Sequence, residues 1–176
     1  ILAWYTTNAN GSLHLYIGSD SEIFANQDST DLFEYIGFAD ICTSAETITN
    51  IDLLNVASVT SMYRMFRYTG WKSMTKLDLG SKFDTSNTTD MTSMFAGTGG
   101  NKMITIKLGD KFDTSRVTNM EYMFDTIGYN EMTSFDLGSK FNTISVTNMA
   151  FMFRNCGHEK LTSLNLGEKF DTSNVT

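Results

Sequence analysis

A strict 29-residue period constrains this chain more than any other feature. The dipeptide Met-Phe begins at residues 65, 94, 123 and 152, and the neighbouring residues keep the same spacing. Residues 77–80, Leu-Asp-Leu-Gly, return as 106–109, 135–138 and 164–167, each time ending in glycine. A strict period of this length is typical of repeat proteins, in which each unit buries its apolar side against its neighbours. The unit is VTxMxxMFxxTGxxxMTxLDLGxKFDTSx.

All eleven methionines fall at three positions of this unit. Equivalent positions in successive units, called columns here, hold Met62, Met91, Met120 and Met149; Met65, Met94, Met123 and Met152; and Met74, Met103 and Met132. Methionine fills irregular gaps in cores, although a Met-rich surface also suits a promiscuous binding groove. Because Leu161 replaces methionine in the third column, we expect core packing.

The unit has the pattern of a leucine-rich repeat. Residues 74–79 read Met-x-x-Leu-x-Leu, and the alternation of Leu77 and Leu79 with Asp78 is typical of a half-buried strand. The Val-Thr-x-Met-x-x-Met-Phe segment spaces its apolar residues at three and four, which favours a helical turn. We therefore expect a leucine-rich-repeat-like solenoid, with a parallel β-sheet on one face and short helical turns or loops behind it. The absence of proline agrees with a ladder that needs every N–H.

The period divides the chain into two regions. We predict an atypical N-terminal capping unit over residues 1–45, in which Leu32-Phe33 is a degenerate Met-Phe. Residues 46–176 are tandem repeats, one short unit followed by 29-residue units, truncated at the C-terminal end. An uncapped edge there invites end-to-end self-association.

Composition excludes several function classes. Thirteen Lys and Arg against twenty Asp and Glu argue against nucleic-acid binding, which needs a basic face. No apolar run is long enough to insert into a membrane, and residues 1–5 do not form a signal peptide. The two histidines and two cysteines form no catalytic or metal-binding spacing, so we expect no enzyme, no metal and no cofactor. Cys42 and Cys156 lie too many units apart for a disulfide.

Residues 170–176 read Phe-Asp-Thr-Ser-Asn-Val-Thr, and residues 112–124 carry the longer form Phe-Asp-Thr-Ser-Arg-Val-Thr-Asn-Met-Glu-Tyr-Met-Phe. These segments resemble the BspA-like leucine-rich-repeat bacterial surface proteins, and in particular their FDTSNVTxMxxMF repeat. The resemblance is strong over residues 46–176 and weak over 13–45, where residues 15–18 read Leu-Tyr-Ile-Gly. It implies an extracellular, cell-surface or cell-wall-attached protein. It also implies adhesion or protein binding without catalysis, with a host or neighbouring-cell surface protein or glycan as partner.

Two sets of columns are candidate binding residues. The turn after Thr-Gly varies most and contains Trp71, Tyr129 and His158, which either anchor a partner or fold back over the edge of the core. The outward strand columns contain Lys76, Asp78, Lys107 and Asp136. They form either a polar recognition surface or a solvated face whose opposite charges pair across strands. The alternative function is a structural spacer or self-assembling element that displays another domain.

Overall fold

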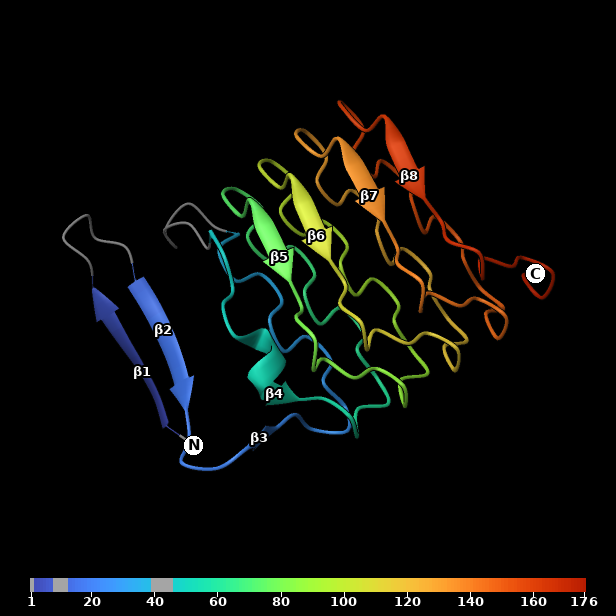
Figure 1. Ribbon diagram of the computed structural model, residues 1–176. Helices are drawn as coiled ribbons and strands as arrows, with labels where there is room; N and C mark the ends of the chain where they lie inside the picture. Colours follow the sequence, from blue (N-terminus) through green and yellow to red (C-terminus); the bar gives the residue numbers. More distant parts are fainter. Residues whose placement is uncertain (1, 8–12, 39–45) are drawn as a thin grey trace.

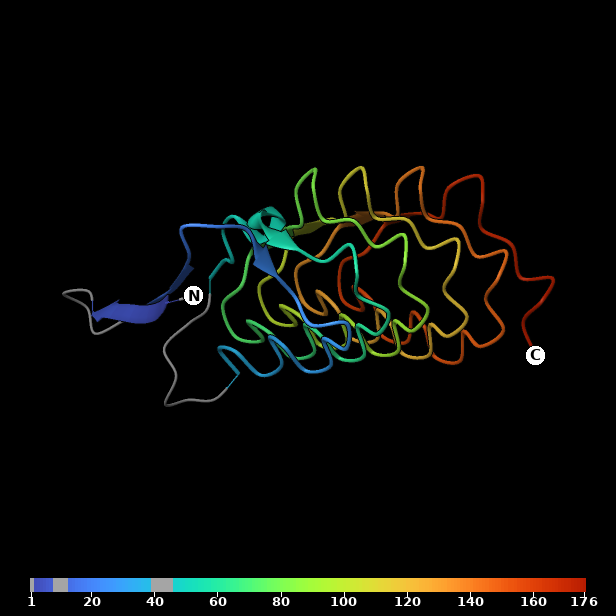
Figure 2. The ribbon, with the colours of Figure 1, turned by 90° about the horizontal axis from the view of Figure 1, so that it is seen from below.

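The computed structural model describes residues 2–7, 13–38 and 46–176, and Figures 1 and 2 show successive units lying side by side along the chain. The elements are β1 (Leu2–Thr7), β2 (Leu13–Gly18), β3 (Ile23–Phe24), the 3-10 helix η1 (Ile51–Leu53), β4 (Leu54–Asn55), β5 (Lys76–Asp78), β6 (Thr105–Lys107), β7 (Ser134–Asp136) and β8 (Ser163–Asn165).

The repeated strands pair in parallel, two at a time. β3 pairs with β4, β5 with β6 and β7 with β8, which differs from the single continuous sheet that we expected. The units are also joined by isolated parallel bridges that run from Asp28 to Ser61, Asp90, Asn119 and Asn148 in turn. The first bridge has a longer offset than the others, and every later bridge repeats the offset of the Met-Phe pairs. The sequence period is therefore the structural period.

The strands β5, β6 and β7 each turn one apolar side chain inward, whereas the equivalent Leu164 of β8 is 38% exposed. In β5, Leu77 is 1% exposed between the exposed Lys76 and Asp78, as the alternating sequence predicts. Ile106 and Phe135 are buried in the same way in β6 and β7. The glycine that follows each strand has a positive φ, for example +71° at Gly80, which a residue with a Cβ rarely adopts.

The segments behind the strands are consecutive β-turns, so of the expected short helical turns or loops the structure has loops and not helical turns. Met65 N–H donates to the Met62 carbonyl three residues back, which closes a β-turn, whereas Phe66 N–H donates across to Met94 of the next unit. Arg64 and Tyr68 have φ of 56° and 54°, and these left-handed residues interrupt any helix. Apolar residues spaced at three and four therefore occur here in β-turns, whose N–H groups donate alternately within the turn and to the next unit.

The core confirms the interpretation of the methionine columns. Ten of the eleven methionines are buried, and Met149 packs against the core at its edge. The phenylalanines of the Met-Phe pairs form a stack, with ring centroids 5.5 Å apart between Phe66 and Phe95 and 5.6 Å apart between Phe95 and Phe124. The near-parallel rings, within 3° in both pairs, require each unit to repeat the previous one closely.

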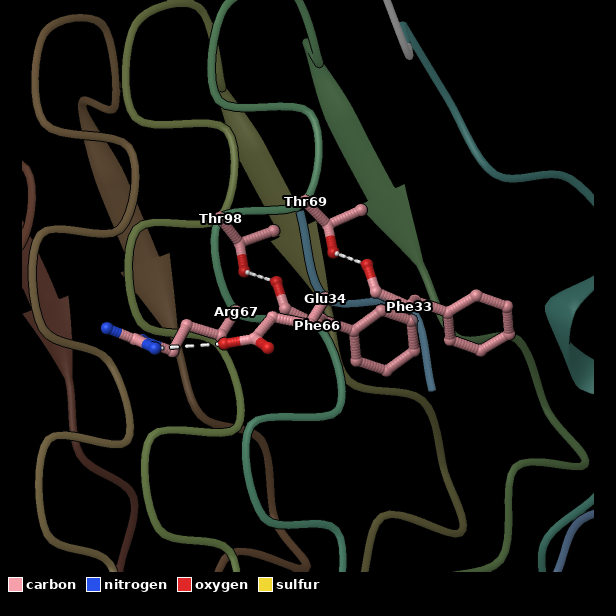
Figure 3. A network of polar contacts seen from close by, with 6 residues as sticks. All are labelled: Phe33, Glu34, Phe66, Arg67, Thr69 and Thr98. Atoms are coloured by element: carbon pink, nitrogen blue, oxygen red, sulfur yellow. Dashed lines mark hydrogen bonds and ion pairs between the residues drawn. The ribbon is translucent and has the colours of Figure 1, made fainter. Parts of the chain in front are cut away.

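Buried threonines join neighbouring units by hydroxyl hydrogen bonds. Thr69 Oγ1 donates to the Phe33 carbonyl at 2.6 Å, and Thr98 Oγ1 donates to the Phe66 carbonyl at 2.7 Å (Figure 3). A second column does the same through Thr85, whose Oγ1 donates to Asp113 O at 2.8 Å. A ladder of threonine hydroxyls thus runs along the Thr85 column, and it holds adjacent turns together.

The N-terminal region departs from the repeat. β1 and β2 form an antiparallel hairpin, in which residues 15–18 pair with residues 2–5 and not with another repeat. The weak likeness of Leu-Tyr-Ile-Gly to the repeated strand therefore does not extend to its structure. In contrast, Phe33 stacks on Phe66 at 5.2 Å, which confirms that Leu32-Phe33 occupies the Met-Phe position. None of the helices in the described ranges is long and apolar enough to cross a membrane.

Candidate functional site

The variable turn column places aromatic side chains on the outer surface of the turns. Trp71, Gly100, Tyr129 and His158 follow one another in successive units. The backbone continues across them, since Asn101 N–H donates to the Trp71 carbonyl at 2.9 Å and Asn130 N–H to Gly100 at 3.1 Å. Trp71 is half-buried, and its ring occupies the space that a Cβ on Gly100 would need. It thus folds over the neighbouring turn while keeping part of its surface in solvent.

Trp71 belongs to a cluster of four rings, called the aromatic patch here, that consists of Tyr35, Phe38, Tyr68 and Trp71. The centroids of Tyr68 and Trp71 are 5.6 Å apart, and those of Tyr35 and Tyr68 are 5.5 Å apart in a stacked arrangement. Phe38 lies 5.2 Å from Tyr68 and 6.2 Å from Trp71. Tyr35 is 45% exposed and Phe38 is 37% exposed, so the patch presents aromatic surface to solvent.

An ion pair borders the aromatic patch. Arg67 Nη1 lies 2.9 Å from Glu34 Oε1 of the preceding unit (Figure 3), and the guanidinium sits 4.8 Å from the Tyr68 ring centroid. Partial burial disfavours the charge on Arg67, but the hydrogen bond to Glu34 and the neighbouring tyrosines outweigh it and raise its pKa. The arginine is therefore held as a fixed cation beside the rings.

A similar arrangement recurs three units further on. Tyr122 and Phe151 stack with centroids 5.0 Å apart, and Arg154 lies over both rings. Arg154 also makes a bidentate pair with the buried Asp125, at 2.9 and 2.7 Å. The hydrogen bond to Asp125 raises the pKa of Arg154. Arginine and aromatic side chains together thus mark two places on the turn surface.

Tyr129 and His158 form a smaller pair of rings. Their centroids are 4.7 Å apart and their planes differ by 8°, so each ring face covers the other. His158 Nδ1 lies 2.9 Å from Glu159 Oε1. These two predicted residues are brought together, but they lie in later units than Trp71 and do not join the aromatic patch.

The strand face holds Lys76, Asp78, Lys107 and Asp136 in solvent, as the sequence predicts. Lys107 Nζ lies 3.8 Å from Asp78 Oδ2, an exposed pair worth at most about 1 kcal/mol. Asp78 Oδ1 and Asp136 Oδ1 also accept hydrogen bonds from the glycine N–H two residues later, at 3.0 and 2.8 Å. The predicted alternation of charges pairs β5 with β6, but Lys107 and Asp136 make no ion pair with each other.

A family match agrees with the repeat. The family model described as "Mycoplasma protein of unknown function, DUF285" matches residues 38–127 and again residues 99–176. The chain belongs to the DUF285 family. The two matches share residues 99–127, the length of one repeat unit. No curated protein and no solved structure matches this chain.

Chemically reactive groups in this DUF285 chain are few. Cys156 is half-buried against the core, and burial raises its pKa to about 12, so the thiol is protonated at neutral pH. Cys42, the other cysteine, lies outside the described residues. Within the described ranges, no three His, Cys, Asp or Glu side chains are grouped so that they could hold a metal ion.

Sequence reasoning identified Trp71 but missed the other three rings of the aromatic patch and Arg67. Glu34 and Arg67 pair although they are 33 residues apart in the sequence. Tyr35 directly follows Glu34 and Tyr68 directly follows Arg67, so the two tyrosines have the same separation. A search at the shorter period of the later units does not align these residues. The sequence signal that would have found them is the degenerate Met-Phe at Leu32-Phe33, which precedes Met65-Phe66 by the same offset, and the stack of Phe33 on Phe66 confirms this alignment.

Proposed function

We propose that this chain is a non-catalytic protein-binding or adhesion module of a bacterial cell surface, built as a leucine-rich-repeat-like solenoid of the BspA type. The repeat motif and the parallel bridges at its period support the architecture. The extracellular, cell-surface or cell-wall location follows from the resemblance of the repeat motif. The aromatic patch is the observation that supports the binding role.

The composition of the aromatic patch favours binding. Trp, Tyr and Arg are the side chains most enriched among residues that dominate interface energies. Here Trp71, Tyr35 and Tyr68 lie within one cluster beside Arg67, whose position is fixed by Glu34. Rings that are already packed against each other lose little conformational entropy when a partner covers them.

The ring orientation favours a protein partner over a glycan. Tyr35 and Tyr68 are within 13° of parallel and the Tyr68 ring also lies against Gly97, so the Tyr68 ring and one face of the Tyr35 ring are covered within the chain. Edges and the exposed parts of Tyr35 and Phe38 remain for contact. A sugar ring that stacks flat on an aromatic face would have to displace these contacts first.

The experiment is a binding screen of the intact chain against purified host and bacterial surface proteins and glycans. The proposal expects a protein ligand whose affinity falls at least about tenfold in Trp71→Ala and Tyr35→Ala. Lys76→Ala on the strand face is the matched exposed control and keeps full affinity, while circular dichroism confirms that each variant is folded. If no ligand binds, or if Lys76→Ala weakens binding as much as Trp71→Ala, the proposal is wrong. No binding together with concentration-dependent association favours the structural spacer.

A further inference from the structure

The strand face is interrupted at one junction. β5 pairs with β6 and β7 pairs with β8, but within the described residues no backbone hydrogen bond joins β6 to β7. Figure 1 shows the wider interval between these two strands. Behind them the same two units stay joined, since Met91 N–H donates to Asn119 O at 3.1 Å and Phe95 N–H to Met123 O at 3.0 Å. The gap is therefore confined to the strand side.

The hydrogen bond that is absent between β6 and β7 can be identified from the bonds at the equivalent positions of the other two strand pairs. Leu79 N–H donates to Lys107 O at 3.0 Å and Leu137 N–H donates to Asn165 O at 3.1 Å. The equivalent bond would run from Leu108 N–H to Asp136 O, and the structure has neither this bond nor any other hydrogen bond to these two atoms in the described chain. One backbone donor and one backbone acceptor thus border the gap without a protein partner.

A bulky side chain accounts for the interruption. Leu77, Ile106, Phe135 and Leu164 occupy one column, and Phe135 is its only aromatic member. Its ring packs edge-on against Phe124 with centroids 4.9 Å apart. The larger ring needs more space inside its unit, so β7 lies further from β6.

The gap continues into a cleft of about 230 Å³ between the loops that follow β6 and β7. Its charged lining residues are Lys107, Asp110, Asp136 and Lys140. A Cβ placed on Gly138, in the cleft wall, would have no atom within 4 Å. A Cβ placed on the equivalent Gly167 would lie 3.2 Å from the Gly138 carbonyl oxygen. Asp110 and Lys140 make no hydrogen bond or ion pair in the parts of the chain that the structure describes.

We infer that this cleft binds a primary carboxamide, the side chain of an Asn or Gln presented by a protein partner. Among the groups of the lining residues that have no hydrogen-bond partner in the described chain are two donors, Leu108 N–H and the Lys140 ammonium, and two acceptors, the Asp136 carbonyl and the Asp110 carboxylate. A carboxamide has a carbonyl oxygen with two lone pairs and a nitrogen with two hydrogens, which complements this set.

The charges select a neutral ligand. Two lysines and two aspartates line the cleft, so a carboxylate is opposed by the aspartates and an ammonium by the lysines. The volume is below the ~300–1,000 Å³ of ordinary small-molecule sites, which suits one side chain better than a whole ligand. Only the protein source of the side chain rests on the proposed function; a free probe tests the cleft itself.

The test is an NMR titration of the whole chain with N-acetyl-glutamine methylamide, with N-acetyl-glutamate methylamide as the matched probe. We expect saturable shifts of the Leu108 amide and the Asp136 carbonyl with the glutamine probe, and about tenfold weaker binding of the glutamate probe. Lys140→Ala weakens glutamine binding by up to about tenfold, while Lys82→Ala, in the same column but away from the cleft, leaves it unchanged.

Two results would overturn the inference. One is an equal response to both probes, or no shift of Leu108 up to the solubility limit of the glutamine probe. The other is an equal effect of Lys140→Ala and Lys82→Ala on binding. Because the probes are small and free in solution, these outcomes are independent of whether any ligand binds at the aromatic patch.

Discussion

Alanine substitutions at two equivalent glycines measure how closely the units approach at different junctions. Gly109 and Gly138 follow β6 and β7, with φ of 84° and 79°, so the left-handed strain of an alanine is nearly the same at both. They differ in their surroundings. A Cβ on Gly109 would overlap the Gly80 carbonyl, whereas a Cβ on Gly138 has nothing within 4 Å.

The magnitudes follow from these contacts. Left-handed backbone costs about 1–2 kcal/mol for a residue with a Cβ, which is the whole expected loss for Gly138→Ala. Gly109→Ala adds the clash, which must separate β5 from β6 and break hydrogen bonds such as Leu79 N–H to Lys107 O, at about 0.5–1.5 kcal/mol each. We expect a total of about 2–4 kcal/mol at Gly109, with Gly167→Ala between the two because its Cβ would lie 3.2 Å from the Gly138 carbonyl.

The assay is urea unfolding followed by circular dichroism, with the free energy of unfolding compared among the three variants. If destabilisation follows the order Gly109 > Gly167 > Gly138, the result supports a close junction between the β5 and β6 units and an open junction between the β6 and β7 units. Equal losses at Gly109 and Gly138 would refute the reasoning, because they would show that strain alone sets the cost.

Four further measurements test other parts of the structure. Asp125→Asn removes the charge that pairs with Arg154 at 2.7 and 2.9 Å, and should lower the midpoint of urea unfolding at low salt more than at high salt; an unchanged midpoint contradicts this. Thr98→Val loses a buried 2.7 Å hydrogen bond and should cost about 1 kcal/mol, whereas Thr98→Ser keeps the hydroxyl and should cost less. In a Cys42→Ser chain, Cys156 should react with iodoacetamide at pH 8 about a thousandfold more slowly than in urea, because its pKa is raised from 9.0 to about 12. Since the folded chain holds the thiol protonated, stability should fall as the pH rises above about 9; reaction at the unfolded rate would contradict the burial. Burial disfavours the charge on Asp84, but hydrogen bonds from Ser86 and the charge of Lys111 outweigh it and lower the pKa of Asp84. A lowered folded pKa means that this contribution to stability is present above the unfolded pKa and is lost as the pH falls through the folded one. An NMR titration should therefore place the Asp84 midpoint below the usual aspartate value of 3.8, and a midpoint at or above this value contradicts the geometry.

The sequence predicted the features that a repeated pattern determines. The period of the units, the buried methionine columns and the inward side chains of β5, β6 and β7 are present because these units bury the same positions against their neighbours. The exposed Lys76, Asp78, Lys107 and Asp136 follow from the same alternation.

Other features could not be predicted from the pattern. The turn segments have the apolar spacing of a helix, and they are β-turns because of their three-residue hydrogen bonds and of left-handed residues such as Arg64 and Tyr68, which no propensity favours. The aromatic patch depends on the longer offset of the first junction. The gap after β6 depends on Phe135, a conservative apolar replacement whose effect is one of volume.

The central claim is that consecutive units are joined in parallel at the period of the repeat, through turns and not through helices. Scalar couplings across hydrogen bonds, measured by NMR, detect each N–H···O=C pair directly. The structure predicts couplings from Phe66 N–H to Met94 O and from Phe124 N–H to Met152 O, and none from Leu108 N–H to Asp136 O. A coupling from Phe66 N–H to the carbonyl of Met62 would show a helix and contradict the account.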